Sequence, residues 1–519
     1  FADPISCLSA YGKLTISIDK AFDELKQSVE FAEKYFPNVR VIGSCGFGYN
    51  SAGASAVQEL GFVFAAIVEY ANRLIEKGLP VEKVFKNIRV TFGISSSYFM
   101  EIAKLRASKL LWNTIVKTYG LNTEEHKLYI HARTSKYNQT KYDPYVNMLR
   151  TTTQAFSAVL GGVDSLHTNA FDEEFNTPDE FGRRIARNTQ IILKEESNLV
   201  KLIDPAGGSY YVEKLTDEVA SLSWALLQEV EKQGGMVNAI KNEFVQNEIK
   251  KVSDLRISDL VKRKSVLVGT NMYANVKENL PEKRIFDKAA FIKKRAEFLQ
   301  KYRVSGNNEK HAAIIEKLGK LSDSSSEELF ETGIAAYVEG ATLGEVANSL
   351  HSGYEESCSV TPLKIYRLAE KFEELRDTAE EFKKKHGYTP KIFLATMGPV
   401  KQHKGRADFS RGFFEVAGFE VIYPNALSGA AEAISAFEKS GANVVVICST
   451  DDTYPDIVPA FMQELKLKEK TGLVVLAGYP KEQVEAYKEA GVSEFIYLGC
   501  DAYTLLKRVQ AKSIELSVN

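Results

Sequence analysis

The stretch Ile88-Arg-Val-Thr-Phe-Gly-Ile94, followed by the long segment 97–120, shows how the N-terminal half of the chain folds. The first is a short run rich in β-branched and aromatic residues, which is typical of a strand. The second carries apolar residues at three- and four-residue spacing, which predicts an amphipathic helix. A strand followed by a crossover helix is the repeating unit of a parallel sheet.

This strand and helix pattern recurs from the start of the chain to about residue 235. The expected strands are residues 39–47, 88–94, 127–134, 164–169 and 200–204. An eight-stranded barrel needs roughly 250 residues, so five units predict part of a (β/α)8 TIM barrel. We expect about three further units before Phe1 in the native protein. A complete, open five-stranded sheet is the alternative.

The rest of the chain divides into a charged helical stretch and a second α/β region. From about 236 to 385 the alternation is lost, and the helical segments are 327–339, 342–350 and 362–386. Five further strands are expected at 391–397, 419–423, 443–449, 473–477 and 494–498, each followed by a helix. The interpretation is a partial barrel over 1–255, a helical linker over 256–385 and a flavodoxin-like doubly wound domain over 386–519.

Composition excludes several classes of protein. The net charge of -2 gives no overall field to attract nucleic acid or an anionic membrane, and no run of about 20 apolar residues could span a bilayer. The five cysteines form no CxxC pair, which favours reduced thiols in a cytoplasmic protein. The seven histidines offer no HxxxH or HExxH pair, so a zinc enzyme is not expected. The chain begins Phe-Ala-Asp-Pro, without an initiator Met, and we expect a missing N-terminal stretch.

Candidate sites lie where strands end. His131 and His167 fall in or near the carboxyl-terminal halves of expected barrel strands, and barrel active sites are built at that face. A hydrogen-bonded structural role is the alternative for each. In the second region, ligands of doubly wound sheets bind beyond the carboxyl ends of the strands. The loops to examine there are 398–406, 449–452 and 478–480.

Several long segments resemble the barrel signatures of methylmalonyl-CoA mutases. They are Phe99-Met-Glu-Ile-Ala-Lys-Leu-Arg106, Ser165-Leu-His-Thr-Asn169, Arg184-Ile-Ala-Arg-Asn-Thr-Gln190, Asp204-Pro-Ala-Gly-Gly-Ser209 and Glu229-Val-Glu-Lys-Gln-Gly-Gly-Met236. The resemblance implies a barrel that holds an acyl-CoA and a C-terminal domain that brings adenosylcobalamin to its mouth. It also implies a radical interconversion of methylmalonyl-CoA and succinyl-CoA, in which the cofactor carries the chemistry.

The barrel departs from the family at the expected pocket. Tyr129 stands where the family has its carboxylate-binding Arg, and a Tyr cannot supply that fixed positive fork. Asn50 stands in place of a longer Gln, in a loop that has also lost the family's His. His131 and His167 are kept. The resemblance therefore implies a pocket that retains some polar groups without a complete catalytic site.

The C-terminal domain departs at the cobalt-ligand motif, Asp-x-His-x-x-Gly. In one register Val400 and Gln402 replace the Asp and the His; in the other His403 is the ligand and Lys401 replaces the Asp. Neither Val400 nor Lys401 can accept the imidazole proton. His403 is thus the only cobalt-ligand candidate. The positions that line the family's cofactor slot fall at Ser449 and Gly478, and we expect this slot to be closed.

These departures favour the small, non-catalytic subunit of a heterodimeric methylmalonyl-CoA mutase. Its partner would be the homologous large subunit, which would bind adenosylcobalamin and act on the acyl-CoA. Two alternatives stay open. One is a catalytically competent mutase with an altered acyl-CoA preference, in which Tyr129 reflects a substrate without a free carboxylate. The other is a regulatory or chaperone-like partner.

Overall fold

The computed structural model describes residues 2–278, 282–284, 286–304, 307–321, 327–351, 358–468 and 472–518. The chain forms two compact units. The first comprises Phe1–Ser135, Thr151–Val252 and Lys283–Ile365. The second comprises Lys136–Arg150, Ser253–Glu282 and Tyr366–Asn519.

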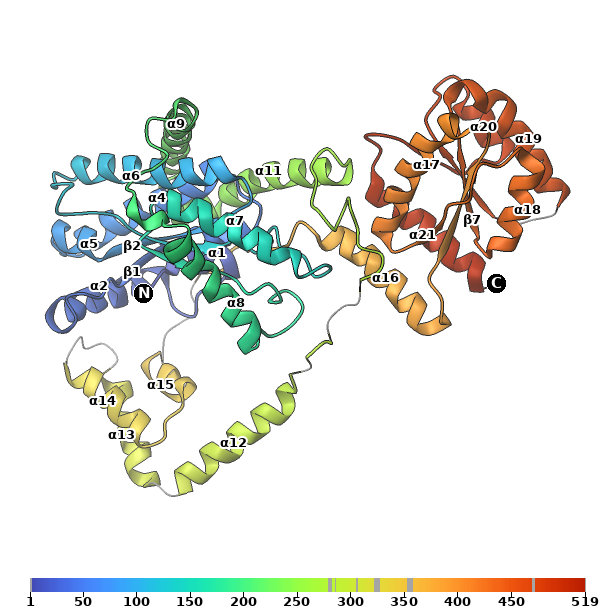
Figure 1. The fold of residues 1–519 in the computed structure, drawn as a ribbon. Helices are drawn as coiled ribbons and strands as arrows, with labels where there is room; N and C mark the ends of the chain where they lie inside the picture. The colour runs from blue at the N-terminus through green and yellow to red at the C-terminus, as the bar shows by residue number, and fades with distance from the viewer. Residues whose placement is uncertain are drawn as a thin grey trace. The chain divides into compact units, whose positions relative to one another are not determined.

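The first unit contains a four-stranded sheet whose strands are all parallel and follow chain order (Figure 1). The strands are β1 (Ile42–Cys45), β2 (Ile88–Ile94), β3 (Tyr129–Thr134) and β4 (Ser165–His167). Sequential parallel strands with crossover helices are compatible with part of a (β/α) barrel. Four of the five strands expected in this half are confirmed, with ends that differ by a few residues.

Helices precede, connect and follow these strands along the chain. They are α1 (Pro4–Tyr11), α2 (Ile18–Tyr35), α3 (Phe47–Ser51), α4 (Ala56–Glu76), α5 (Val81–Asn87), α6 (Tyr98–Thr118), α7 (Val146–Leu160), α8 (Glu180–Ile191), α9 (Tyr210–Lys232), α10 (Met236–Lys241) and α11 (Phe244–Val261). Helix α4 starts at a capping box between Ser55 and Gln58 and packs against β1, β2 and α9. Within the described residues, no helix has both the length and the apolar content needed to cross a bilayer.

The prediction of a strand at 200–204 is wrong. Residues Leu199–Lys201 form a 3-10 turn, and Leu202 and Ile203 are 67% and 99% exposed. Both ends of the segment turn sharply, because Asn198 and Asp204 have φ angles of 54° and 47°. Pro205 follows directly and has no N–H to donate to a sheet. The apolar run resembled a buried strand. The turns at its two ends, however, prevent the backbone from staying extended and pairing with a neighbouring strand.

The helical stretch divides between the two units. Helices α12 (Lys288–Val304), α13 (Asn308–Lys320), α14 (Glu327–Val338) and α15 (Leu343–Leu350) belong to the first unit. Helices α13, α14 and α15 share a small core of their own, built around Leu318, Ala336, Ala341 and Val346. Helix α16 (Glu370–His386) belongs to the second unit and buries Phe372 and Leu375 in its core.

The second unit is built on a five-stranded parallel sheet in the order β6-β5-β7-β8-β9. The strands are β5 (Lys391–Thr396), β6 (Glu420–Ile422), β7 (Val444–Cys448), β8 (Leu473–Ala477) and β9 (Glu494–Ile496). This is the strand order of flavodoxin-like sheets, and the five strands expected here are confirmed. Strand order reverses between β5 and β7, which is where such sheets bind ligands.

Helices cover both faces of this second sheet (Figure 1). They are α17 (Val400–Phe414), α18 (Ala430–Ser440), α19 (Tyr454–Leu467), α20 (Val484–Ala490) and α21 (Ala502–Val518). Alternate side chains of β5 enter different cores: Ile392 packs with α16, α17 and α21, and Phe393 packs with α18 and α19. Because both faces are buried, the strands are continuous apolar runs rather than alternating ones.

Candidate functional site

The face of the first sheet that points away from the apolar core is polar. Side chains alternate along a strand, and β3 directs Tyr129, His131 and Arg133 away from the apolar core. The register of the sheet adds Arg89, Ser165 and His167 to the same face. In a closed barrel this face would turn inward, where packed barrels usually carry branched apolar residues. A polar inner face is therefore suited to a ligand rather than to a packed core.

His131 occupies the middle of this face. Its Nδ1 atom lies 2.7 Å from the Ser165 hydroxyl oxygen. Burial lowers the pKa of His131, and the nearby charges of Arg89, His167 and Arg133 act in the same direction. Because the ordinary pKa of His is about 6.5, the ring is neutral at neutral pH. A neutral imidazole donates one hydrogen bond and accepts another, but it cannot neutralise an anion.

Tyr129 and His167 lie at opposite ends of the strands. Tyr129 is the first residue of β3, at the amino edge, and the Arg40 guanidinium lies 5.5 Å from the centre of its ring. His167 is the last residue of β4, at the carboxyl edge, and is exposed. Since barrel sites are built at the carboxyl edge, His167 has the better position for ligand contact. A pocket role for Tyr129 stays a prediction.

The carboxamide of Asn50 is engaged inside the protein. Asn50 lies in α3, directly after β1, and is buried. The Ser135 hydroxyl donates to its Oδ1 over 2.6 Å, and its Nδ2 donates to Glu59 over 3.3 Å. Only glycine fits beneath it at position 93, because a Cβ there would lie 2.5 Å from the Asn50 Cγ. Asn50 therefore holds β1, β2 and β3 together at their carboxyl ends.

A buried ionic cluster next to Asn50 was missed from the sequence. The Lys104 ammonium lies 2.7 Å from a Glu59 oxygen and 2.5 Å from a Glu101 oxygen, and all three side chains are at most 3% exposed. Burial raises the pKa of Glu59, and the Lys104 charge opposes this shift. The spacing of residues along α6 could have indicated this cluster. Glu101 and Lys104 lie on the same face of the helix as the buried Leu111, so both charged side chains are expected to be buried.

The carboxyl edge of the second sheet differs from the expected loop. Helix α17 begins at Val400, so most of the loop expected over 398–406 is helical. His403 is only 3% exposed, and its Nδ1 lies 3.0 Å from the Gly398 carbonyl oxygen. That carbonyl can accept the imidazole proton, so an acceptor exists that the motif itself did not reveal. The ring as a whole is buried against the start of α17.

Tyr454 fills the space between the ends of β7 and β8. Its side chain is fully buried, and its hydroxyl donates to the Ala477 carbonyl over 2.6 Å. The same oxygen accepts from the Ser449 backbone N–H over 3.2 Å. Ser449 is therefore tied to β8 through Tyr454. The sequence placed Ser449 correctly beyond β7 but gave no indication of the Tyr454 ring.

An ion pair covers Gly478 beyond β8. The Arg406 Nη2 atom lies 3.1 and 3.0 Å from the two carboxylate oxygens of Asp451. A Cβ at Gly478 would lie 3.0 Å from Arg406 Nη1 and from an Asp451 oxygen, and 3.2 Å from the Tyr454 ring. The Arg406 and Asp451 side chains therefore lie against Gly478. At the carboxyl edge of the second sheet, the space beside Gly478 is thus occupied by side chains of the chain itself.

The fold and its two sites define a class of α/β proteins. Its members combine parallel β/α units of barrel type with a flavodoxin-like unit, and both units present ligand sites at strand carboxyl ends. The chain belongs to the methylmalonyl-CoA mutase family, whose sequence model matches residues 1–356.

Similar proteins include both kinds of subunit. The chain is 31% identical over 505 residues to "Methylmalonyl-CoA mutase small subunit" of Streptomyces virginiae, covering 97% of this chain and 69% of the relative. It is 30% identical over 485 residues to the protein of the same name from Porphyromonas gingivalis, covering 93% and 67%. "Methylmalonyl-CoA mutase large subunit" of Porphyromonas gingivalis is 30% identical over 473 residues, covering 89% and 66%. The chain thus spans about two thirds of the length of these relatives.

Proposed function

We propose that this chain is the small subunit of a cytoplasmic, heterodimeric methylmalonyl-CoA mutase. Its homologous large partner binds adenosylcobalamin and carries out the radical interconversion of methylmalonyl-CoA and succinyl-CoA. This chain supports that reaction without binding the cofactor. The existence of separately named small and large subunits among its relatives supports a two-chain enzyme.

The filled edge of the second sheet is the observation that carries this proposal. A cobalamin domain needs an accessible axial ligand and an open slot for the nucleotide tail. Here His403 is buried, Tyr454 lies between the ends of β7 and β8, and the Arg406–Asp451 pair covers Gly478. The flavodoxin-like fold is kept while its ligand site is filled by the protein's own side chains. Such a unit is suited to a structural role.

The polar face of the first sheet favours a second candidate. His131, Arg133 and His167 keep hydrogen-bonding groups where an acyl-CoA would lie in a barrel. This arrangement is consistent with a competent mutase of altered acyl-CoA preference. The filled cofactor site argues against it, because the radical chemistry of the family depends on the cofactor.

Reconstitution with the large subunit distinguishes the candidates. We expect the large chain alone to be inactive or weakly active, and the two chains mixed to co-purify and to interconvert methylmalonyl-CoA and succinyl-CoA. Rates are measured by product chromatography, for each chain alone and for the mixture. Turnover of isobutyryl-CoA by this chain alone would favour the second candidate. Full activity of the large chain without this one would contradict a supporting role and favour a regulatory one.

A further inference from the structure

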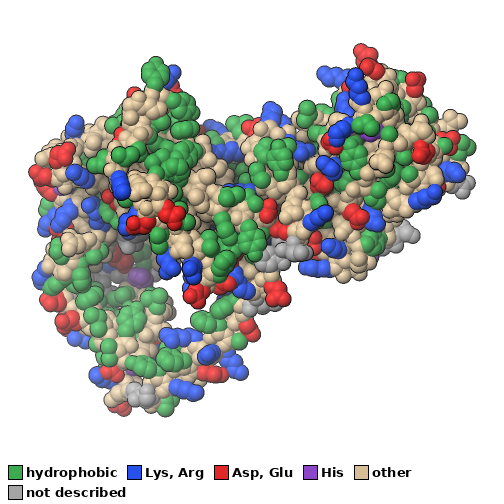
Figure 2. Space-filling model, in the orientation of Figure 1, with side chains coloured by type: hydrophobic (Ala, Val, Ile, Leu, Met, Phe, Trp, Pro, Cys, Tyr) green, Lys and Arg blue, Asp and Glu red, His purple; other side chains and the backbone are tan. Residues whose placement is uncertain are grey.

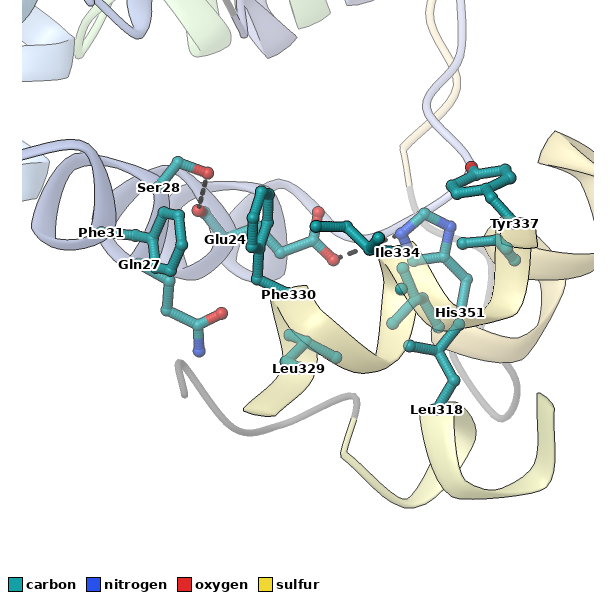
Figure 3. Close-up of a pocket in the computed structure, with 13 residues that line it drawn as sticks. Glu24, Gln27, Ser28, Phe31, Leu318, Leu329, Phe330, Ile334, Tyr337 and His351 are labelled. Atoms are coloured by element: carbon teal, nitrogen blue, oxygen red, sulfur yellow. Dashed lines mark hydrogen bonds and ion pairs between the residues drawn. The ribbon is translucent and has the colours of Figure 1, made fainter. Parts of the chain in front are cut away.

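A groove of about 420 Å³ lies in the first unit between α2 and the α13–α15 helices (Figure 3). Its walls are mainly apolar and include Phe31 of α2 and Leu318, Phe330, Ile334 and Leu350 of the other helices. Hydrophobic side chains also gather over these helices on the surface (Figure 2). The volume lies in the range of about 300–1,000 Å³ that is common for small-molecule sites.

The groove exists because α2 and the α13–α15 helices touch at a few points rather than along their length. At one end the Phe31 and Phe330 rings lie 5.0 Å apart, and the Tyr35 hydroxyl donates to Glu327 over 2.6 Å. The α13–α15 helices have their own core, so they do not need to fill this space for their own packing. An apolar molecule there would bury surface on both sides of the groove.

The opposite end of the groove carries a carboxylate. The Glu24 carboxylate lies 3.4 Å from the His351 Nε2, and the two side chains point toward each other (Figure 3). Burial raises the pKa of Glu24, the charges of His351 and Lys20 lower it, and Asp23 raises it slightly further. The Glu24 side chain is 38% exposed, and its carboxylate lines the groove beside its ion-pair partner His351. A cation in the groove would pair with the same carboxylate.

We propose that this groove binds a small organic amine, with its ammonium group beside Glu24 and its apolar body between Phe31, Phe330 and Ile334. Apolar contact supplies most of the affinity, and the ammonium group supplies the preference over neutral or acidic ligands of the same shape. The site shares no residue with either strand-end site and does not depend on the proposed subunit role.

Titration calorimetry with three matched probes tests the charge preference. We expect hexylammonium to bind more tightly than hexanol, and hexanoate to bind about tenfold more weakly than hexylammonium. Glu24→Gln should reduce the affinity for hexylammonium to that for hexanol and leave hexanol binding unchanged. Equal affinities of the native chain for hexylammonium and hexanoate, or no binding of any probe, would overturn the proposal.

A second variant tests the location. Gly333 lines the groove, and a Cβ there would meet no atom within 4 Å, so Gly333→Leu should fill the groove without a clash. Leu also favours a helix more than Gly does, so the variant should fold. Gly344→Leu in α15, an exposed position outside the groove, is the matched control. Hexylammonium binding should be lost in the first variant and kept in the second; unchanged binding in Gly333→Leu would place any amine site elsewhere.

Discussion

Replacing Lys104 by Met should lower the free energy of unfolding of the first unit by about 3–5 kcal/mol. The ammonium group is fully buried between Glu59 and Glu101, which are themselves buried. Without the Lys104 ammonium, two buried carboxylates share a site with no positive charge. Each carboxylate then either stays charged at a cost in desolvation free energy or takes up a proton. Urea unfolding followed by tryptophan fluorescence measures the loss, because Trp112 and Trp224 both lie in this unit.

A matched control separates the buried charge from the helix itself. Lys117 lies on the same helix, α6, and is exposed. Lys117→Met should change the free energy of unfolding by no more than about 0.5 kcal/mol. If both variants lose the same small amount, the buried Lys104 charge does not stabilise the first unit.

Replacing Tyr454 by Ala should lower the free energy of unfolding of the second unit by about 3–5 kcal/mol. The ring is fully buried between β7 and β8, and its removal leaves a cavity. It also leaves the Ser449 N–H and the Ala477 carbonyl without their hydroxyl partner. Hydrogen exchange of peptides from β7 and β8, read by mass spectrometry, should become faster in the variant.

Two further variants divide this effect. Tyr454→Phe keeps the ring and loses only the hydroxyl, so about 1–3 kcal/mol should be lost. Tyr479→Ala removes a ring that is 41% exposed and should have a small effect. An effect of Tyr454→Ala no larger than that of Tyr479→Ala would mean that Tyr454 does not hold the strand ends together.

Periodicity predicted most of the fold because strands and helices have different repeats. Runs such as Val444–Cys448 are buried on both sides and could be recognised as continuous apolar segments. The run at 200–204 failed because the positive φ angles at its ends come from the local fold rather than from a sequence pattern. A loop was predicted over 398–406, but most of this segment belongs to helix α17. The sequence before Val400 offers only Pro399 as a signal that a helix begins there. The domain division at 255 and 385 stays a prediction.

The site was less predictable because its decisive contacts join distant segments. The position of Ser449 followed from the strand that precedes it. The Arg406–Asp451 pair joins α17 to the segment after β7, and sequence spacing cannot show which charged side chains meet across a sheet. The Gly398 carbonyl beside His403 is a backbone group, which no residue pattern reveals.

Cobalamin binding by this chain alone tests the central claim most directly. The purified chain is dialysed to equilibrium against adenosylcobalamin, and the retained corrin is measured by absorbance, with the large subunit as the positive control. We predict no retained corrin, because His403 is buried and the space at Gly478 is filled. Retention of one equivalent, lost on His403→Ala, would contradict a chain that supports the reaction without binding the cofactor.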